Sequence, residues 1–401
     1  MKKYSLIIAF CLAVAGLTAA NPVRKTIQAG GLEREYLVYT PENNHSLPEG
    51  LMVCLHGFNG SMGNFFSDYP IYKIADSLNY LIVAPQALPE QSQSLIDEAA
   101  TISLVTGNKL SLNAVWGCGL KVKALLLDEE LNRSVDDVEF IRLMILRTLE
   151  DFALKAENIF LTGTSMGGYM AYQFALKQPV KLSGIVSIVG SMGLNIRGMG
   201  EGMKVPVCDF HSVTDEVVPY TGSMESFGVK VSLAYPKQEV LDYWVQTNGA
   251  GTPVRENVSY YPSTNGITVE KITWPHPEYE VVHYKMNGSN HSYFFRKEAG
   301  DCMDYVEEIT KFIAAHAAPR PDGIGFVPEQ QQPAVYPNPA YEVIYFGVMN
   351  GNVSICDFTG REILSAPFSA GQLEVSFLKP GMYILSIRSD GTLRTAKLIK
   401  R

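Results

Sequence analysis

The chain of 401 residues has few of the residues that mark disulfide-rich proteins. It has six cysteines, and five lie beyond the first twenty residues: Cys54, Cys118, Cys208, Cys302 and Cys356. An odd number at wide spacing does not form a disulfide framework, and the apolar runs around Cys54 and Cys208 are typical of small buried thiols. The pairing is left open, with one bridge between Cys118 and Cys302 as an alternative.

The chain also lacks an excess of positive charge. Lys and Arg number 33 and Asp and Glu 41, so the formal net charge is −8. This balance does not favour nucleic acid or an anionic membrane as a partner. No HExxH, paired CxxC or calcium-loop pattern occurs, so we expect no metal and no other cofactor.

The apolar run at the N-terminus is shorter than the about 20 residues that a membrane-spanning helix needs. In MKKYSLIIAFCLAVAGLTAA it follows Lys2 and Lys3 and ends in small residues, which is typical of a secretory signal peptide. Phe10 before Cys11 does not fit a lipoprotein, in which a small residue precedes the modified cysteine. We therefore expect residues 1–20 to be a signal peptide. Its removal takes away two lysines and no acid, which changes the net charge from −8 to −10.

Strand-like and helix-like segments alternate between residues 21 and 316. The segment 134–154 repeats apolar residues at intervals of three and four, begins with Ser134 as a candidate cap, and is predicted to be a helix. Several strand-like segments are continuous apolar runs, as expected where helices cover both faces of a sheet. The order predicts an α/β fold with an open, mostly parallel sheet. Further expected strands are 34–41, 50–57, 78–86, 157–163, 182–190, 205–212 and 280–288, and further expected helices are 167–178 and 302–317.

The composition changes abruptly after residue 316. Proline, glycine and glutamine dominate 317–334, which is typical of a linker. From 335 to 401 no helical period occurs, and short strand-like pieces are separated by glycine and aspartate turns. The sequence therefore predicts a small all-β sandwich appended to the larger domain.

A serine lies at the junction between an expected strand and an expected helix. The stretch Gly163-Thr164-Ser165-Met166-Gly167 matches the pattern of a nucleophile elbow, in which the serine occupies a strained turn and side chains two residues away would collide. The alternative is an ordinary helix-capping serine. Three other Gly-Ser-Met triplets lack glycine two residues before the serine, and they contain Ser61, Ser191 and Ser223.

A serine hydroxyl needs a base that takes its proton, and in this topology the acid and then the histidine follow the serine in the chain. His291 lies in a glycine-containing loop after an expected strand and before the last helix, where a base can reach the elbow. His283 lies inside a strand, and His276 and His316 are expected near the surface. We therefore predict His291 as the base, with an incidental loop histidine as the alternative.

Catalytic groups in open α/β sheets gather beyond the carboxyl ends of the strands. Asp215 follows the end of the expected strand 205–212, whereas Asp209 lies within it. Asp215 is therefore the preferred acid, and Asp209 and Glu216 are the alternatives. His211 is expected to be a packing or turn residue.

The negative charge that develops on a substrate oxygen needs oriented donors. We expect one to be the backbone N–H of Met166, at the start of the helix, and the other to be the backbone N–H of Phe58 in the turn LHGFNG, where His56 is expected to be structural. The loop 190–202 is expected to line a substrate cleft. Trp116 is a candidate aromatic wall for the substrate, with core packing as the alternative.

With these residues placed, the main domain resembles the α/β-hydrolase esterases of carbohydrate esterase family 1 and the polyhydroxybutyrate depolymerases. The resemblance covers about residues 24–316 and is carried by REYLVYTP, LHGFNGS, DDVEFIRLMI, GTSMGGYMAYQFA, HSVTDEVVPY and GSNHSYFF. It implies a triad of Ser165, Asp215 and His291, with Phe58 and Met166 as oxyanion donors. Depolymerase-like members tend to have LHGC, HGxxD and HxWP where this chain has LHGF, HSVTD and HSYF.

The C-terminal segment resembles the sorting domain of the type IX secretion system of Bacteroidetes. VYPNPA, VSICDFTGREI, LKPGMYILSI and the basic end AKLIKR carry this likeness. It implies recognition by the outer-membrane secretion machinery and a location outside the cell or on its surface. An accessory sandwich or carbohydrate-binding module is the alternative.

Together these expectations describe a secreted serine carboxylic-ester hydrolase that removes feruloyl or acetyl groups from plant polysaccharide. A polyhydroxybutyrate depolymerase or a secreted serine peptidase would use the same chemistry. A noncatalytic surface-binding protein on a hydrolase scaffold is the alternative from another class, because a fold alone does not establish a function. The sequence does not determine the acyl group, the oligomeric state or whether the C-terminal domain is removed.

Overall fold

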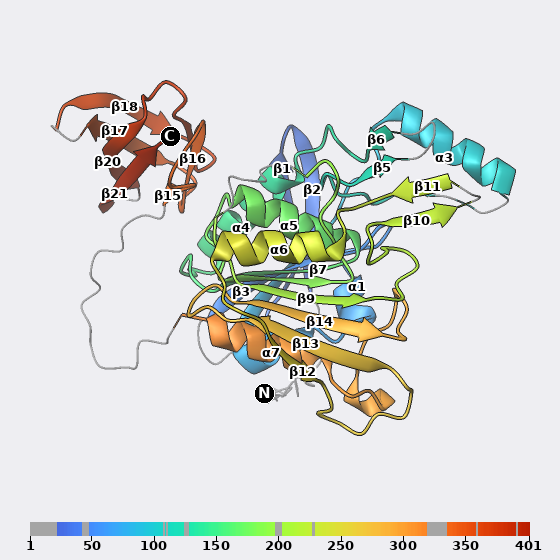
Figure 1. Ribbon diagram of the computed structural model, residues 1–401. Helices are drawn as coiled ribbons and strands as arrows, with labels where there is room; N and C mark the ends of the chain where they lie inside the picture. The colour runs from blue at the N-terminus through green and yellow to red at the C-terminus, as the bar shows by residue number, and fades with distance from the viewer. Residues whose placement is uncertain are drawn as a thin grey trace, which may run out of the picture.

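The structure is a computed structural model that describes residues 22–41, 48–106, 109, 111–123, 128–196, 203–226, 229–318, 335–357, 360–389 and 392–401. The expected signal peptide and nearly all of the expected linker lie outside these residues. No helix within the described ranges is long and apolar enough to cross a membrane. Figure 1 shows a large α/β unit with a central sheet and, at the C-terminus, a small unit made only of strands.

The central sheet has ten strands, and its middle six are parallel. The strand order is β1-β2-β4-β3-β7-β8-β9-β14-β13-β12, and antiparallel pairing is confined to the two edges. The prediction of an open, mostly parallel sheet is therefore confirmed. The strands are β1 (Val23–Ala29), β2 (Leu32–Tyr39), β3 (Gly50–Leu55), β4 (Tyr80–Pro85), β7 (Ile159–Thr164), β8 (Gly184–Ile188), β9 (Val207–Ser212), β12 (Val254–Asn257), β13 (Thr268–Trp274) and β14 (Val281–Asn287).

Helices cover both faces of this sheet (Figure 1). On one face α4 (Asp137–Asp151), α5 (Met166–Lys177) and α6 (Lys237–Asn248) share a hydrophobic core, and on the other α1 (Asn64–Ser67), α2 (Tyr72–Leu78) and α7 (Tyr305–His316) share a second core. Because both faces are covered, every residue of β3, β4, β7, β8 and β9 is buried. This explains why most residues of these strands are apolar, with β3 and β4 as continuous apolar runs in the sequence.

A smaller unit is inserted between these elements. It contains α3 (Gln93–Thr106) and a four-stranded antiparallel sheet of order β10-β11-β5-β6. Its strands are β5 (Lys121–Lys123), β6 (Asp128–Glu130), β10 (Ser223–Ser226) and β11 (Val229–Ser232). The unit therefore joins two segments that are far apart in the chain.

The sequence analysis did not predict the helices α1, α2, α3 and α6, and it misplaced the start of α4. Asp136, rather than Ser134, caps α4, because its side chain accepts a hydrogen bond from the Glu139 backbone N–H. Residue 134 lies in the preceding turn. The helix α6 did carry a sequence signal, because it follows Pro236, buries Val240, Leu241 and Trp244, and ends at a left-handed Gly249.

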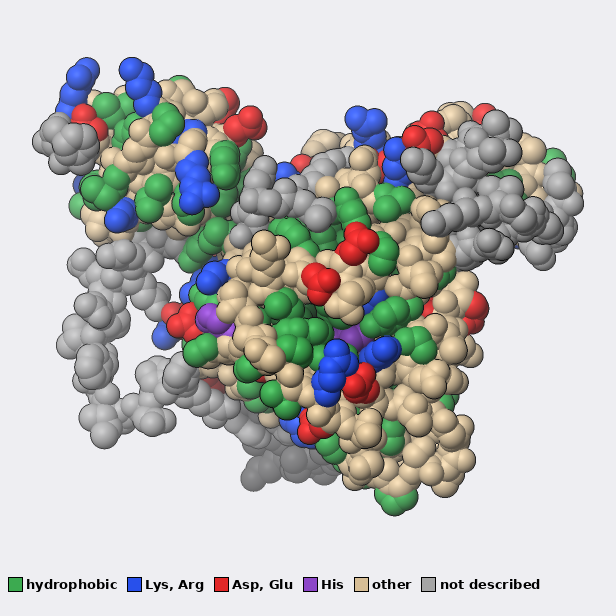
Figure 2. Space-filling model, viewed as in Figure 1, with side chains coloured by type: hydrophobic (Ala, Val, Ile, Leu, Met, Phe, Trp, Pro, Cys, Tyr) green, Lys and Arg blue, Asp and Glu red, His purple; other side chains and the backbone are tan. Residues whose placement is uncertain are grey.

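The described part of the C-terminal unit folds into two small antiparallel sheets around a core of its own, which includes Ile344, Val353 and Leu385. The sheets have the orders β15-β16-β19 and β18-β17-β20-β21. Hydrophobic and basic side chains lie side by side on the face of this unit seen in Figure 2. The strands are β15 (Val335–Tyr336), β16 (Val343–Phe346), β17 (Gly351–Asp357), β18 (Glu362–Phe368), β19 (Gln372–Glu374), β20 (Gly381–Ser389) and β21 (Thr392–Lys400), of which β15 and β18 were not expected.

The five cysteines of the described residues are free thiols. Cys118 belongs to the core on the α4–α6 side of the sheet and Cys302 to the core on the α7 side. The alternative of a bridge between them is therefore wrong, because the sheet separates the two thiols. Burial raises the pKa of Cys54 and of Cys118 above the ordinary range, so both stay protonated.

Candidate active site

Ser165 occupies a sharp bend between β7 and α5. Its backbone has φ 53° and ψ −121°, and it is the residue directly before the first residue of α5. A non-glycine residue with positive φ is strained, and such strain concentrates at functional sites. The Ser165 backbone N–H donates to the Ile188 carbonyl oxygen at 2.8 Å, which fixes the bend to the end of β8.

The glycines around this bend are required by space. A methyl group at Gly163 would lie 2.1 Å from the carbonyl oxygen of Gly167, and one at Gly167 would lie 1.9 Å from that of Leu55. A methyl group at Gly168 would lie 2.9 Å from the Cα of Gly190. The close packing of α5 against β3 and β8 therefore leaves no room for side chains at these glycines, as the sequence pattern suggested.

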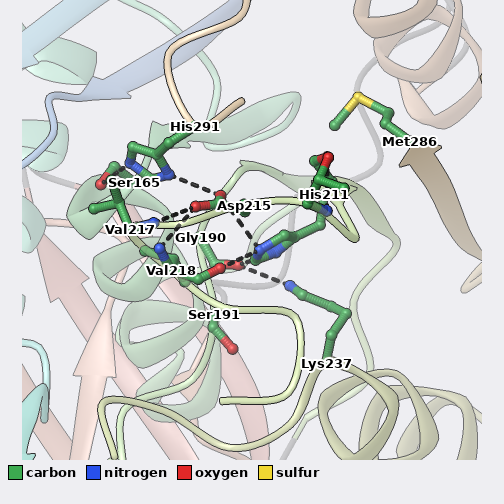
Figure 3. Close-up of polar contacts among 12 residues, drawn as sticks. Ser165, Gly190, Ser191, His211, Asp215, Val217, Val218, Lys237, Met286 and His291 are labelled. Carbon is green, nitrogen blue, oxygen red and sulfur yellow. Dashed lines mark hydrogen bonds and ion pairs between the residues drawn. The ribbon is translucent and has the colours of Figure 1, made fainter. Parts of the chain in front are cut away.

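His291 lies in the loop that follows β14, beyond the carboxyl end of the strand. Its Nε2 is 2.9 Å from Ser165 Oγ, and its Nδ1 is 2.8 Å from Asp215 Oδ2. The side chain of Asp215 is completely buried, and that of His291 is 12% exposed. Figure 3 shows the three side chains in a row, with the His291 ring between the hydroxyl and the carboxylate.

The Asp215 carboxylate is held by its own turn. Its Oδ1 accepts from the backbone N–H groups of Val217 and Val218, at 2.9 and 2.8 Å. Burial favours the neutral carboxyl, but the hydrogen bond and charge of His291 and the Val218 N–H outweigh it and hold the pKa of Asp215 below its ordinary value. Asp215 is therefore an ionised acceptor at neutral pH.

Two hydroxyl groups that the sequence did not single out join the acid turn to the histidine loop. The hydroxyls of Ser212 and Thr214 donate to the Ser289 carbonyl oxygen at 2.7 and 2.8 Å. Ser212 stands where the depolymerase-like pattern has glycine, so the departure HSVTD supplies a bond that glycine cannot make. The HSVTD stretch is visible in the sequence, but only the structure shows the carbonyl that its hydroxyls meet.

The two expected oxyanion donors belong to segments that are next to the serine. Met166 is the first residue of α5, where backbone N–H groups have no acceptor within the helix. A methyl group at Gly57 would lie 3.3 Å from the Cβ of Ser165, so the loop after β3 passes directly beside the hydroxyl, and Phe58 is the next residue. The side chain of Phe58 is 37% exposed.

His56 and Trp116 support this loop from below. His56 Nδ1 donates to the Gly57 carbonyl oxygen at 2.8 Å, and its Nε2 accepts from the Ala87 N–H at 3.1 Å. Burial lowers the pKa of His56 to about 4, so the ring is neutral. The Trp116 indole N–H donates to the His56 carbonyl oxygen at 2.8 Å, and the Trp116 side chain is fully buried. In this structure Trp116 is a support of the loop, not an exposed wall for a substrate.

The alternatives to Asp215 and His291 lie elsewhere. Asp209 and His283 are completely buried and bonded to each other, with His283 Nδ1 2.8 Å from Asp209 Oδ2. Glu216 is exposed. Residues 197–202 of the expected cleft loop lie outside the described residues. Within the described ranges, no group of three or more His, Cys, Asp or Glu side chains is arranged to hold a metal ion.

A mostly parallel sheet flanked by helices, with a serine at a strand-to-helix bend and the acid and histidine after later strands, is the architecture of the α/β-hydrolases. The comparisons with protein families agree with this class. Residues 124–235 match the family model described as Phospholipase/Carboxylesterase, so the large unit contains a carboxylesterase-type domain. Residues 334–401 match the model described as Secretion system C-terminal sorting domain, so the chain ends in a sorting domain.

No curated protein matches the sequence. The acetyl xylan esterase from Aspergillus awamori is similar in structure, with 12% identity, a TM-score of 0.47, and coverage of 73% of this chain and 99% of that chain. An S-formylglutathione hydrolase from Agrobacterium tumefaciens has 12% identity and a TM-score of 0.45, and the match covers 75% of this chain and 98% of that chain. A Pyrococcus horikoshii acylaminoacyl peptidase has 16% identity and a TM-score of 0.46, and the match covers 77% of this chain and 44% of that chain.

Proposed function

We propose that this protein is an exported serine carboxylic-ester hydrolase with Ser165, His291 and Asp215 as its triad. One observation carries the proposal, namely the unbroken series of contacts from Ser165 Oγ to His291 Nε2 at 2.9 Å and from His291 Nδ1 to Asp215 Oδ2 at 2.8 Å. Both distances are those of hydrogen bonds. Ser165 is half-buried, so its hydroxyl stays within reach of a substrate.

In the proposed mechanism each of the three side chains has its own role. The Ser165 hydroxyl donates to His291 Nε2, which takes the proton as the oxygen attacks the ester carbonyl carbon. His291 Nδ1–H donates to Asp215, whose charge stabilises the imidazolium that forms. The imidazolium then protonates the leaving alcohol, and an acyl group remains on Ser165. Water, deprotonated by the same ring, releases the acid and restores the serine.

The oxyanion of each tetrahedral intermediate needs donors that are oriented before the reaction. The backbone N–H groups of Met166 and Phe58 are the donors that we propose, because Met166 starts α5 directly after Ser165 and Phe58 follows Gly57, which passes close to Ser165. The buried supports His56 and Trp116 keep the second donor in place. Loss of one such donor typically costs about 3 kcal/mol of transition-state stabilisation.

Acyl groups esterified to plant polysaccharide, feruloyl or acetyl, are the substrates that we propose. The likeness of the main domain's motifs to family 1 carbohydrate esterases supports this choice, as does a sorting domain that takes the enzyme to a substrate too large to import. We further propose that the chain has a signal peptide at residues 1–20, a hydrolase domain at 21–316 and a linker at 317–334. It would leave the cell through the type IX machinery.

The test compares the wild type with Ser165→Ala and Ser61→Ala on p-nitrophenyl acetate. Ser61 is an exposed serine in another Gly-Ser-Met triplet, so its variant controls for loss of a hydroxyl near the site. We expect Ser165→Ala to fold normally and to lose about 10⁴-fold or more in kcat, while Ser61→Ala keeps its activity. Undiminished turnover by Ser165→Ala would refute the mechanism.

The substrate assignment needs its own measurement. Release of ferulate from feruloylated arabinoxylan or of acetate from acetylxylan would support it. Release of hydroxybutyrate from polyhydroxybutyrate, or of a fragment from a peptide, would replace it with one of the two alternatives. A noncatalytic binding protein would hydrolyse none of these substrates, although the convergence of all three triad members counts against that alternative.

A further inference from the structure

A second histidine, His211, contacts the turn that carries Asp215 from the buried side. Val218 donates its N–H to Asp215 Oδ1 at 2.8 Å, while its carbonyl oxygen lies 2.8 Å from Nε2 of His211. The His211 side chain is completely buried, and its Nε2 is also 3.5 Å from Asp215 Oδ2. His211 therefore contacts the acid both directly and through Val218 (Figure 3).

The other ring nitrogen of His211 lies close to Gly190, which packs beneath Ser165. This nitrogen, Nδ1, is 3.1 Å from the Gly190 carbonyl oxygen. Gly190 packs under the bend, because a methyl group there would lie 2.7 Å from the Cα of Gly168 and 2.9 Å from the carbonyl oxygen of Ser165. One buried ring thus spans the residue beneath Ser165 and the residue that holds Asp215.

A buried ion pair fixes Gly190 in turn. Lys237 Nζ donates to the Gly190 carbonyl oxygen and to Asp209 Oδ1, both at 2.7 Å, and neither charged side chain is exposed to solvent. Asp209 also accepts from the Tyr172 hydroxyl at 2.9 Å and contacts His283 Nδ1 at 2.8 Å. Its carboxylate is thus fully paired, as a buried charge requires.

We propose that His211 is a positioning residue that sets Asp215 relative to Ser165, by holding the Val218 carbonyl oxygen while its ring rests against Gly190. The proposal rests on the function proposed above, because it concerns the same triad. It gives a role to a histidine that the sequence suggested only as a packing or turn residue. His211 touches no substrate, since it is fully buried beneath the acid turn.

The ring has one proton to place. Burial, and then the Lys237 ammonium, lower the pKa of His211 to about 4, so the ring is neutral at neutral pH. Gly190 already accepts from Lys237, and Val218 O is nearer to Nε2 than Gly190 O is to Nδ1, at 2.8 against 3.1 Å. The proton therefore belongs on Nε2, where it is donated to Val218.

This assignment predicts different results for two amide replacements. In His211→Gln the side-chain N–H₂ can occupy the place of Nε2 and donate to Val218, whereas in His211→Asn it can occupy only the place of Nδ1. We expect His211→Gln to stay within about 3-fold of the wild-type kcat for p-nitrophenyl acetate. We expect His211→Asn to lose about 10-fold or more in kcat with little change in KM, because the acid is displaced and not the substrate.

If His211 had a purely structural role, both variants would lose kcat and stability to the same extent. The free energy of unfolding of each variant is therefore measured by urea titration beside its kcat. The proton NMR resonance of the His291–Asp215 hydrogen bond gives a readout that does not need activity. It should persist in His211→Gln and shift or broaden in His211→Asn. Equal kcat values and unchanged resonances in both variants would overturn the positioning role. An inactive wild type would instead refute the proposed function. The resonances of the two variants would still test whether His211 positions Asp215.

Discussion

Ser165 and His291 are 126 residues apart in the chain, yet Ser165 Oγ and His291 Nε2 lie 2.9 Å apart. The parallel sheet explains this distance, because β7 and β14 end at the same edge and the loops after them meet there. The serine has a strained backbone, and the histidine loop is held to the acid turn by Ser212 and Thr214. The contact is therefore built by several elements at once.

Two aspartates of one strand and its following turn should behave in opposite ways. Asp215→Asn should lower kcat about 10³- to 10⁴-fold with little loss of stability, because the amide cannot support the His291 imidazolium. Asp209→Asn should lower the free energy of unfolding by about 3–5 kcal/mol, because Lys237 stays buried without its counter-ion. Kinetics and urea unfolding of both variants check this pair of outcomes. A kcat loss in folded Asp209→Asn as large as that in Asp215→Asn would show that the two roles are not separate.

The bend depends on the absence of a side chain at Gly167. A methyl group there would lie 1.9 Å from the Leu55 carbonyl oxygen, so Gly167→Ala should lower the free energy of unfolding by about 3 kcal/mol or more. Gly63 has φ −81°, and a methyl group there would lie 3.6 Å from Ser61 Oγ. Gly63→Ala is therefore the control and should stay within about 1 kcal/mol. Thermal and urea unfolding measure both, and an equally stable Gly167→Ala would contradict the packing.

Trp116 should matter for catalysis although it is buried. Trp116→Phe keeps an aromatic ring but removes the donor to the His56 carbonyl oxygen, so the loop that carries Phe58 loses a support. We expect kcat to fall about tenfold, less than the 10²- to 10³-fold that loss of a whole oxyanion donor typically costs, with KM nearly unchanged. Trp244 is also fully buried, and its indole N–H has no partner among the described residues. Trp244→Phe is thus the matched control. Equal kcat losses in both variants would contradict the supporting role of the Trp116 indole N–H.

Stability should fall as the pH drops from about 6.5 to 4. His56 and His211 have folded-state pKa values of about 4, against 6.5 in the unfolded chain. At pH 5 the unfolded chain therefore binds more protons than the folded protein, and the free energy of unfolding decreases as the pH falls. Each histidine contributes about 1.4 kcal/mol per pH unit to the slope within that window. In His56→Gln the slope of unfolding free energy against pH near pH 5 should decrease by about that amount. An unchanged slope would mean that His56 is not neutral in the folded protein.

The sequence predicted the parts of the fold that are continuous or periodic. The buried strands β3 and β4 are unbroken apolar runs, β7 and β8 are mostly apolar, and α4 has a clear period, so each was expected near its observed place. The edge strand β12 was not expected, because all four of its residues are exposed and no apolar pattern distinguishes them from a loop. Local patterns thus do not specify β12, whereas the missed helix α6 did carry a sequence signal that went unused.

The same limit applies to the candidate site. Ser165, Asp215 and His291 could be proposed because their chemistry and chain order are restricted by the topology. His211, Lys237 and the Ser289 carbonyl could not, because their importance comes from partners far away in the chain, such as Gly190 for Lys237 and Ser212 for Ser289. Spacing along a sequence does not predict which carbonyl a buried ammonium or hydroxyl will meet. The catalytic roles of the triad stay predictions, which the kinetics of its variants will test.

Reaction of the purified protein with a fluorophosphonate probe, followed by mass spectrometry of its peptides, tests the central claim most directly. A serine whose proton is drawn away by a neighbouring imidazole is phosphonylated, whereas an ordinary hydroxyl is not. We predict one phosphonyl group per chain, on Ser165, with labelling absent in Ser165→Ala and strongly slowed in His291→Gln. An unlabelled wild type, or a label on another serine that persists in Ser165→Ala, would contradict the account.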